Sequence, residues 1–134
     1  MKTKREQRVR DLIDQMTRER GYLPAQWPYA IEKDVDFMEV YNKVYNSALN
    51  SDRVLPIKTR ELIAIALLAF RNMQDGFYPH MKRALRYGAT KEEIFESLKV
   101  SIIIGGGAPS FANALQTLLQ IEEEEKSGRK GRGK

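Results

Sequence analysis

The stretch KTRELIAIALLAFRNMQDGFYPHMKRALRYGAT, residues 58–90, decides how this chain folds. Its first half is apolar without a break from residue 62 to residue 70, and a helix that is apolar all round is expected to be buried on most sides. Pro56 stands just before it, at a position that favours a helix start. Gly88 can end the second half. The stretch therefore predicts a central helix beginning near Pro56 and another helix over about residues 77–87.

The rest of the chain is also predicted to be helical, because no segment shows the alternation of a strand. Thr90 and Glu93 form a capping box, which predicts the start of a helix over about residues 89–104. Three more helices are predicted over about residues 4–20, 34–49 and 109–125. The segment YLPAQWPYA, residues 22–30, holds two prolines and is expected to be a loop or an extended arm. We therefore expect an all-α fold of six helices.

Length and composition are those of one ordinary domain. The chain has 134 residues, of which 42% are apolar and 31% charged. No apolar run approaches the roughly 20 residues that a membrane helix needs, and no secretory signal is visible. With no cysteine, these features favour a cytoplasmic protein without a membrane span. We expect residues 1–125 to form the domain, with residues 1–31 as an N-terminal helix and arm.

The net charge of +5 is concentrated at the two ends of the chain. Residues 1–20 carry seven Lys and Arg against four Asp and Glu, and residues 126–134 carry five Lys and Arg with no acid. The segment between them has a slight acidic excess. The tail KSGRKGRGK, residues 126–134, is expected to be disordered. It is either a solvated tail or a basic arm for polyanions, and the acidic middle makes nucleic-acid binding the weakest reading.

One histidine and no cysteine exclude most standard catalytic and metal sites. A zinc site would have to be completed by carboxylates, so no metal is expected. A Ser-His-Asp triad has no support in one histidine with scattered serines. The glycine-rich segment GGGAPS, residues 105–110, lacks the G-x-G-x-x-G spacing and a preceding strand. We expect it to be a hinge or a close helix contact rather than a phosphate site.

What remains is the spacing of Glu61 and His80, which lie on two consecutive predicted helices. Two antiparallel helices can bring a carboxylate and an imidazole together. Met73 and Gly76 would share a face with His80 if all three lay on one helix. Pro79, however, favours a helix start near residues 77–79, which puts His80 in the first turn. The alternative is that His80 is a capping or surface residue and Glu61 an ordinary first-turn acid.

These residues resemble the carboxymuconolactone decarboxylase / alkylhydroperoxidase D-like family. The similar elements are KTRE before an apolar helix, one histidine before ALRYGAT, then KEEIFE, and a glycine-rich break before ALQTL. DVDFMEVYNKVYNSAL resembles the helix that precedes KTRE in the family. The resemblance covers about residues 32–121 and implies a six-helix single domain of the alkylhydroperoxidase D-like type. It also implies a homo-oligomer, a trimer or a hexamer.

The peroxidase branch of this family carries a motif of the form E-x11-C-x2-C-x3-H. Here Glu61 and His80 match its ends, while Met73 and Gly76 stand at the two cysteine positions. Without thiols no disulfide can form, so disulfide peroxidase activity is not expected. The pattern is closer to the decarboxylase branch, which lacks the cysteine pair.

The resemblance implies a cofactor-independent lyase for a small carboxylated lactone or unsaturated acid. His80 would be the general acid and base, and Glu61 would orient it. Arg71 is expected to hold a substrate carboxylate, and Asp75 lies where the family often has a second polar or histidine residue. Tyr78 and Trp27 are expected at the pocket wall, although Trp27 could instead be an aromatic anchor. The competing hypothesis is a non-catalytic, oligomeric binding or scaffold protein of the same fold.

Overall fold

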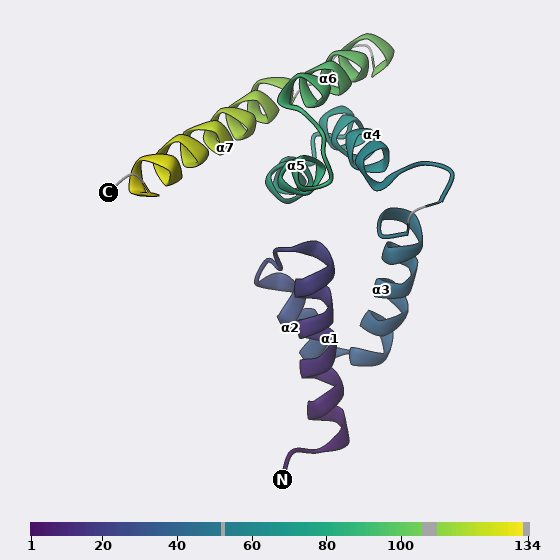
Figure 1. Cartoon of the computed structure of the whole chain (residues 1–134). Coiled ribbons are helices and arrows are strands. Elements are labelled where there is room, and N and C mark those ends of the chain that lie inside the picture. Colours follow the sequence, from purple (N-terminus) through teal and green to yellow (C-terminus); the bar gives the residue numbers. More distant parts are fainter. Residues whose placement is uncertain (52, 106–109, 133–134) are drawn as a thin grey trace. The chain divides into compact units, whose positions relative to one another are not determined.

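The computed structural model describes residues 1–51, 53–105 and 110–132 (Figure 1). These residues form seven α-helices and one short 3-10 helix and contain no strand. The predicted all-α class is confirmed, although the predicted count of six helices was one short. The chain divides into two compact units, Met1–Val54 and Leu55–Lys134. Each unit is described below by itself.

The first unit consists of three helices, α1 (Lys4–Arg20), α2 (Gln26–Lys33) and α3 (Val35–Leu49). A capping box at Thr3 starts α1, and Gly21 ends it in the left-handed conformation, with φ of 73°. All three helices contribute to one apolar core, formed by Val9, Leu12, Met16, Ile31, Val35 and Met38. The core of this unit therefore comes from residues three and four apart on α1 and from the junction of α2 and α3.

The prediction of a loop or extended arm over residues 22–30 was wrong for its second half. Helix α2 begins at Gln26, so Pro28 is its third residue. A proline in the first helical turn costs no hydrogen bond, because the N–H groups there have no intrahelical acceptor. Ile31, which is fully buried, ties α2 to α1 and α3.

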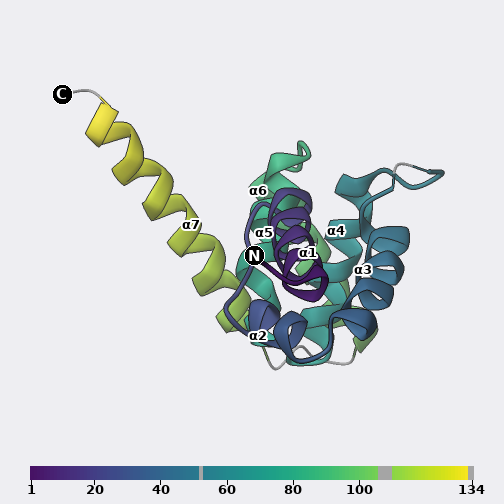
Figure 2. The same ribbon diagram turned by 90° about the horizontal axis from the view of Figure 1, so that it is seen from below.

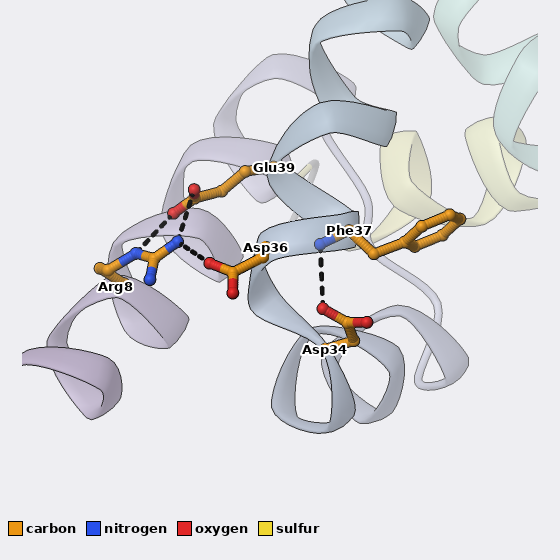
Figure 3. A network of polar contacts seen from close by, with 5 residues as sticks. All are labelled: Arg8, Asp34, Asp36, Phe37 and Glu39. Atoms are coloured by element: carbon orange, nitrogen blue, oxygen red, sulfur yellow. Dashed lines mark hydrogen bonds and ion pairs between the residues drawn. The ribbon is translucent and has the colours of Figure 1, made fainter.

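An exposed charge cluster joins α1 to α3 (Figure 3). The Arg8 guanidinium donates from Nε to Glu39 Oε1 at 3.0 Å and from Nη2 to Glu39 Oε2 at 2.7 Å, and it also binds Asp36. These hydrogen bonds lower the pKa of Glu39. Asp34 caps α3 by accepting a hydrogen bond from the Phe37 N–H at 3.0 Å. The ion pairs of Arg8 with Asp36 and Glu39 therefore tie α1 to α3.

The second unit is built around α4 (Ile57–Phe70), which packs against both α5 (Phe77–Arg86) and α6 (Lys91–Gly105) (Figure 1). A 3-10 helix, η1 (Gln74–Gly76), links α4 to α5. The last helix, α7 (Phe111–Arg132), packs on α5 and α6 and then extends beyond them (Figure 2). The helix starts predicted at Pro56 and Thr90 are confirmed within one residue, and the capping box of Thr90 and Glu93 is present in both directions.

Burial on α4 differs from the prediction. Its buried residues recur every four positions, at Ile57, Glu61, Ile65 and Ala69. Ile63 and Leu67 are exposed. An unbroken apolar run predicted burial on most sides, but α5 and α6 cover only one face of α4 among the described residues. The consequence is that a carboxylate, Glu61, occupies the buried face while several aliphatic side chains lie outside it.

Helix α7 runs past the predicted end at residue 125 and continues to Arg132, in the segment expected to be a disordered tail. The acidic run is therefore inside the helix and not at its C-terminus. Lys91 lies 2.8 Å from Glu125 and 3.7 Å from Glu122, and its hydrogen bond lowers the pKa of Glu125. The basic residues at the end, such as Lys130, suit the negative pole of the helix dipole. Residues 133–134 lie outside the described part.

The glycine-rich break after α6 is described only at its two edges, since residues 106–109, including the predicted helix start at Pro109, lie outside the described residues. A Cβ on Gly105 would come within 2.5 Å of the Phe70 ring, so this glycine allows a close approach to the end of α4. Fully buried Ser110 donates to the Ala69 carbonyl at 2.9 Å. Both edges therefore pack against α4. Within the described segments, no helix has the length and hydropathy to cross a bilayer.

Candidate active site

Glu61 and His80 meet in the second unit, as the sequence predicted. His80 Nδ1 lies 2.6 Å from Glu61 Oε2. Glu61 is fully buried, and the His80 side chain retains 19% of its surface. A buried carboxylate placed against one ring nitrogen fixes the orientation of the imidazole and leaves the other nitrogen, Nε2, for a ligand.

The fold of α4 and α5 explains this pairing. Glu61 belongs to the buried stripe of α4, one turn before Ile65. Helix α5 begins at Phe77, so Pro79 is its third residue and His80 its fourth, as expected. Fully buried Met81 and Ala84 anchor α5 in the core shared with α4. Two packed helices thus carry the two groups toward each other.

Arg83 is a third member of this cluster that the sequence analysis missed. Its Nε lies 3.4 Å from Glu61 Oε1, and its side chain is 2% exposed. Its guanidinium carbon also lies 5.4 Å from the centre of the Tyr87 ring. The only sequence signal is its spacing of three from His80, which puts both side chains on one face of α5. Lys82 and Arg86 surround it, and they hide this position within an ordinary basic helix.

Met73 and Gly76, which stand at the two cysteine positions of the family motif, belong to neither α4 nor α5. Asn72, with φ of 57°, turns the chain after α4, Met73 precedes η1, and Gly76 ends it. Met73, Gly76 and His80 therefore do not share one helix, in agreement with the helix start that Pro79 predicted. Met73 is 51% exposed. A Cβ on Gly76 would meet the Leu68 side chain at 2.7 Å, so this position is filled from α4.

Two other predicted substrate contacts lie at the link between α4 and α5, and both are exposed. Arg71 caps the end of α4, and Asp75 belongs to η1. The N-terminus of α5 is partly occupied by the same link, because the Phe77 N–H donates to the Gln74 carbonyl. This reduces the number of N–H groups that could bind an anion there.

The two predicted wall residues have different surroundings. Tyr78, next to Pro79 on α5, donates its hydroxyl to Glu124 Oε2 of α7 at 2.8 Å, and this hydrogen bond lowers the pKa of Glu124. Trp27 belongs to the first unit, where its ring stacks on Tyr41 with centroids 5.3 Å apart. The aromatic-anchor reading of Trp27 is thus the one that its contacts within the first unit favour. In the described parts of the chain, no group of three His, Asp or Glu residues is placed to hold a metal ion.

Residues 36–119 match the family model of the carboxymuconolactone decarboxylase family. The chain belongs to this family. The matched segment begins in α3 and ends within α7, and it contains Glu61, His80 and Arg83. The resemblance found in the sequence is therefore confirmed at the level of the family.

The chain is also similar in sequence to proteins of Methanocaldococcus jannaschii and Cupriavidus necator. An uncharacterized protein of Methanocaldococcus jannaschii is 34% identical over 91 residues, which cover 67% of this chain and 86% of that protein. An uncharacterized protein of Cupriavidus necator is 40% identical over 60 residues, or 45% of this chain. The match spans only about half, 53%, of the Cupriavidus protein.

Two crystal structures have a similar fold. A candidate carboxymuconolactone decarboxylase from Burkholderia xenovorans LB400 is 22% identical, with a TM-score of 0.74 and coverage of 90% of this chain and 98% of that one. A carboxymuconolactone decarboxylase family protein from Legionella pneumophila is 26% identical, with a TM-score of 0.62 and coverage of 90% and 96%. These similarities confirm the fold predicted from the sequence.

Proposed function

We propose that this chain is a cofactor-independent lyase that removes CO2 from a small carboxylated lactone or a related unsaturated acid. The observation that carries the proposal is the 2.6 Å contact between His80 Nδ1 and the fully buried Glu61 carboxylate. Family membership supports the substrate class.

The reaction needs a proton donor at one carbon of the substrate. The bond between that carbon and its carboxylate breaks, CO2 leaves, and the electron pair moves into the conjugated carbonyl. His80, protonated at Nε2, then delivers its proton to the substrate carbon. Glu61 holds the ring and stabilises the imidazolium form until the proton is transferred.

The substrate contacts are proposed on weaker support than the dyad. Arg71 is a surface guanidinium able to bind a carboxylate bidentately, and Asp75 lies close to it in the chain. Tyr78 is two residues from His80 on α5. Trp27 stays a proposed wall residue, although its own unit already supplies a stacking partner. With Met73 and Gly76 at the cysteine positions, we propose that the chain has no disulfide peroxidase activity.

A decarboxylation assay with matched variants tests the proposal. Purified protein is incubated with 4-carboxymuconolactone and a panel of unsaturated lactone and β-keto acids, and CO2 release is measured. His80→Ala is expected to lower the rate by about 10²–10⁴-fold, the usual contribution of a general acid or base. Lys82→Ala, an exposed change on the same helix, is expected to leave it unchanged. Equal rates for His80→Ala and the unaltered protein would contradict the assigned role.

The second candidate is a non-catalytic, oligomeric binding protein of the same fold. Three exposed aliphatic side chains on one face of α6 favour it, namely Val100, Ile103 and Ile104, which are 58%, 79% and 82% exposed. We propose a homo-oligomer under either function, with a trimer or hexamer as the expected size. Light scattering tests this: a monomer would contradict the assembly, and an oligomer without turnover on the whole panel would favour the binding function.

A further inference from the structure

We propose that Arg83 is a positioning residue that holds Glu61 as a carboxylate and thereby keeps neutral His80 in the tautomer with its hydrogen on Nδ1. The importance of this tautomer for turnover rests on the proposed lyase function. The tautomer itself follows from the geometry of three residues and can be measured without any substrate.

The two oxygens of Glu61 have different partners. Oε2 lies 2.6 Å from His80 Nδ1, and Oε1 lies 3.4 Å from Arg83 Nε. Glu61 is fully buried and the Arg83 side chain is 2% exposed, so water contributes little to their stabilisation. A buried carboxyl group needs a nearby cation or it is favoured in its protonated, neutral form. Arg83 supplies that cation whatever the charge of the imidazole.

The charge of Glu61 decides which ring nitrogen carries the hydrogen. An ionised carboxylate only accepts hydrogen bonds, so the facing Nδ1 must be the donor. A protonated carboxyl group would instead donate to Nδ1 and leave the hydrogen on Nε2. In the first case Nε2 has a free lone pair that can take up a proton and pass it to a substrate. In the second case Nε2 cannot act as a base. Arg83 therefore determines the chemistry of His80 through Glu61.

Arg83 is also held rigidly enough for this role. It is on the same helix as His80, three residues later, and α5 is anchored in the core on both sides of it by Met81 and Ala84. The ring of Tyr87 lies one turn further along the helix, 5.4 Å from the guanidinium. Lys82 and Arg86, the other nearby cations of α5, are exposed.

Nuclear magnetic resonance can read the tautomer directly, because His80 is the only histidine of the chain. Long-range ¹H–¹⁵N correlation spectra of ¹⁵N-labelled protein, recorded where the ring is neutral, distinguish the protonated nitrogen from the unprotonated one. The unaltered protein is expected to carry the hydrogen on Nδ1. In Arg83→Gln, which keeps a long polar side chain but has no charge, the hydrogen is expected to move to Nε2 or to divide between the two nitrogens.

Two matched variants separate positioning from packing. Arg83→Lys restores the positive charge and is expected to return the tautomer of the unaltered protein. Arg86→Gln removes an equal charge from an exposed position of α5 and is expected to change nothing. The proposal is wrong if the unaltered protein carries its hydrogen on Nε2, or if Arg83→Gln leaves the spectrum unchanged.

A double variant keeps the test decisive if Arg83→Gln does not fold. In Glu61→Gln/Arg83→Gln no buried carboxylate remains to need a cation. If only the double variant folds, Arg83 acts through the charge of Glu61, as proposed. If neither folds, the role of Arg83 is packing, and the proposal is overturned. The CO2 assay is run in parallel: absence of turnover with the expected spectra refutes the lyase alone, whereas turnover with an unaltered Arg83→Gln spectrum refutes the role of Arg83.

Discussion

Replacing Glu61 by glutamine removes a charge from the core while nearly keeping the shape of the side chain. At the 3.4 Å that separates Arg83 Nε from Glu61 Oε1, two unit charges attract by about 5 kcal/mol at an effective dielectric constant of about 20. The neutral amide has no desolvation cost of a buried charge, and this offsets part of the lost attraction. Its oxygen also still accepts a hydrogen bond. We therefore expect a loss of about 3 kcal/mol, the lower end of the range for breaking a buried ion pair.

Such a loss is a large part of the about 5–15 kcal/mol that stabilises an ordinary domain. For a chain of this length it corresponds to a fall of about 10 °C in the melting temperature. Urea unfolding followed by circular dichroism gives the free energy, and a thermal scan gives the melting temperature. The matched control is Glu96→Gln, which removes a carboxylate from an exposed position of α6. Its unfolding free energy should stay within about 0.5 kcal/mol of the unaltered protein.

The result that would refute the reasoning is an equal effect of the two substitutions. If Glu61→Gln unfolds at the same urea concentration as Glu96→Gln, the Glu61 charge contributes nothing net to the folded state. The ion pair with Arg83 would then not explain why a carboxylate is tolerated in this core.

Two further predictions concern the link before α5 and the start of α6. Gly76→Cys should lower the unfolding free energy by about 1–3 kcal/mol, because its Cβ would lie 2.7 Å from the Leu68 side chain. Met73→Cys, at an exposed position, should change the unfolding free energy little. Equal midpoints of urea unfolding for the two variants would contradict this. The hydrogen bond from the Thr90 N–H lowers the pKa of Glu93 below its ordinary 4.5. The contribution of the Glu93 carboxylate to the free energy of unfolding is therefore present above that pH and is lost as the pH falls through the lowered pKa. Between pH 5 and pH 3 the free energy of unfolding should depend less on pH in Glu93→Gln than in the unaltered protein, and an equal pH dependence would count against this.

The helices that the sequence predicted well have strong local signals. The capping box at Thr90, the glycine at residue 88 and the apolar run of α4 each place a helix boundary or a core segment without knowledge of the rest of the fold. Helix α2 was missed because the two prolines of residues 22–30 were taken as helix breakers, although Pro24 precedes the helix and Pro28 lies in its first turn, where proline is tolerated. The length of α7 was missed because the tail over residues 126–134 has glycines, charge and no apolar residue, a composition typical of disorder, whereas α7 continues to Arg132.

The candidate site was predictable only in part for a similar reason. Glu61 and His80 could be paired because the chain has one histidine and because the spacing fits a known motif. Arg83 could not be distinguished from the neighbouring basic residues, since its burial depends on where α4 places Glu61. The helix start near Pro79 could be predicted from the sequence, whereas the left-handed residue Asn72 and the 3-10 turn that precede this start could not.

The burial of Glu61 among Ile57, Ile65 and Ala69 also has a meaning for how this fold can change over evolutionary time. A carboxylate in a row of aliphatic residues does not favour stability, because replacing a buried ion pair by well-packed apolar side chains is often neutral or stabilising. A lineage freed from selection for chemistry would drift toward leucine at residue 61, with apolar partners at residues 80 and 83, and would lose nothing in stability. Under the proposed lyase function, the identity of residue 61 is therefore expected to distinguish members of this fold that transfer protons from members kept only as scaffolds.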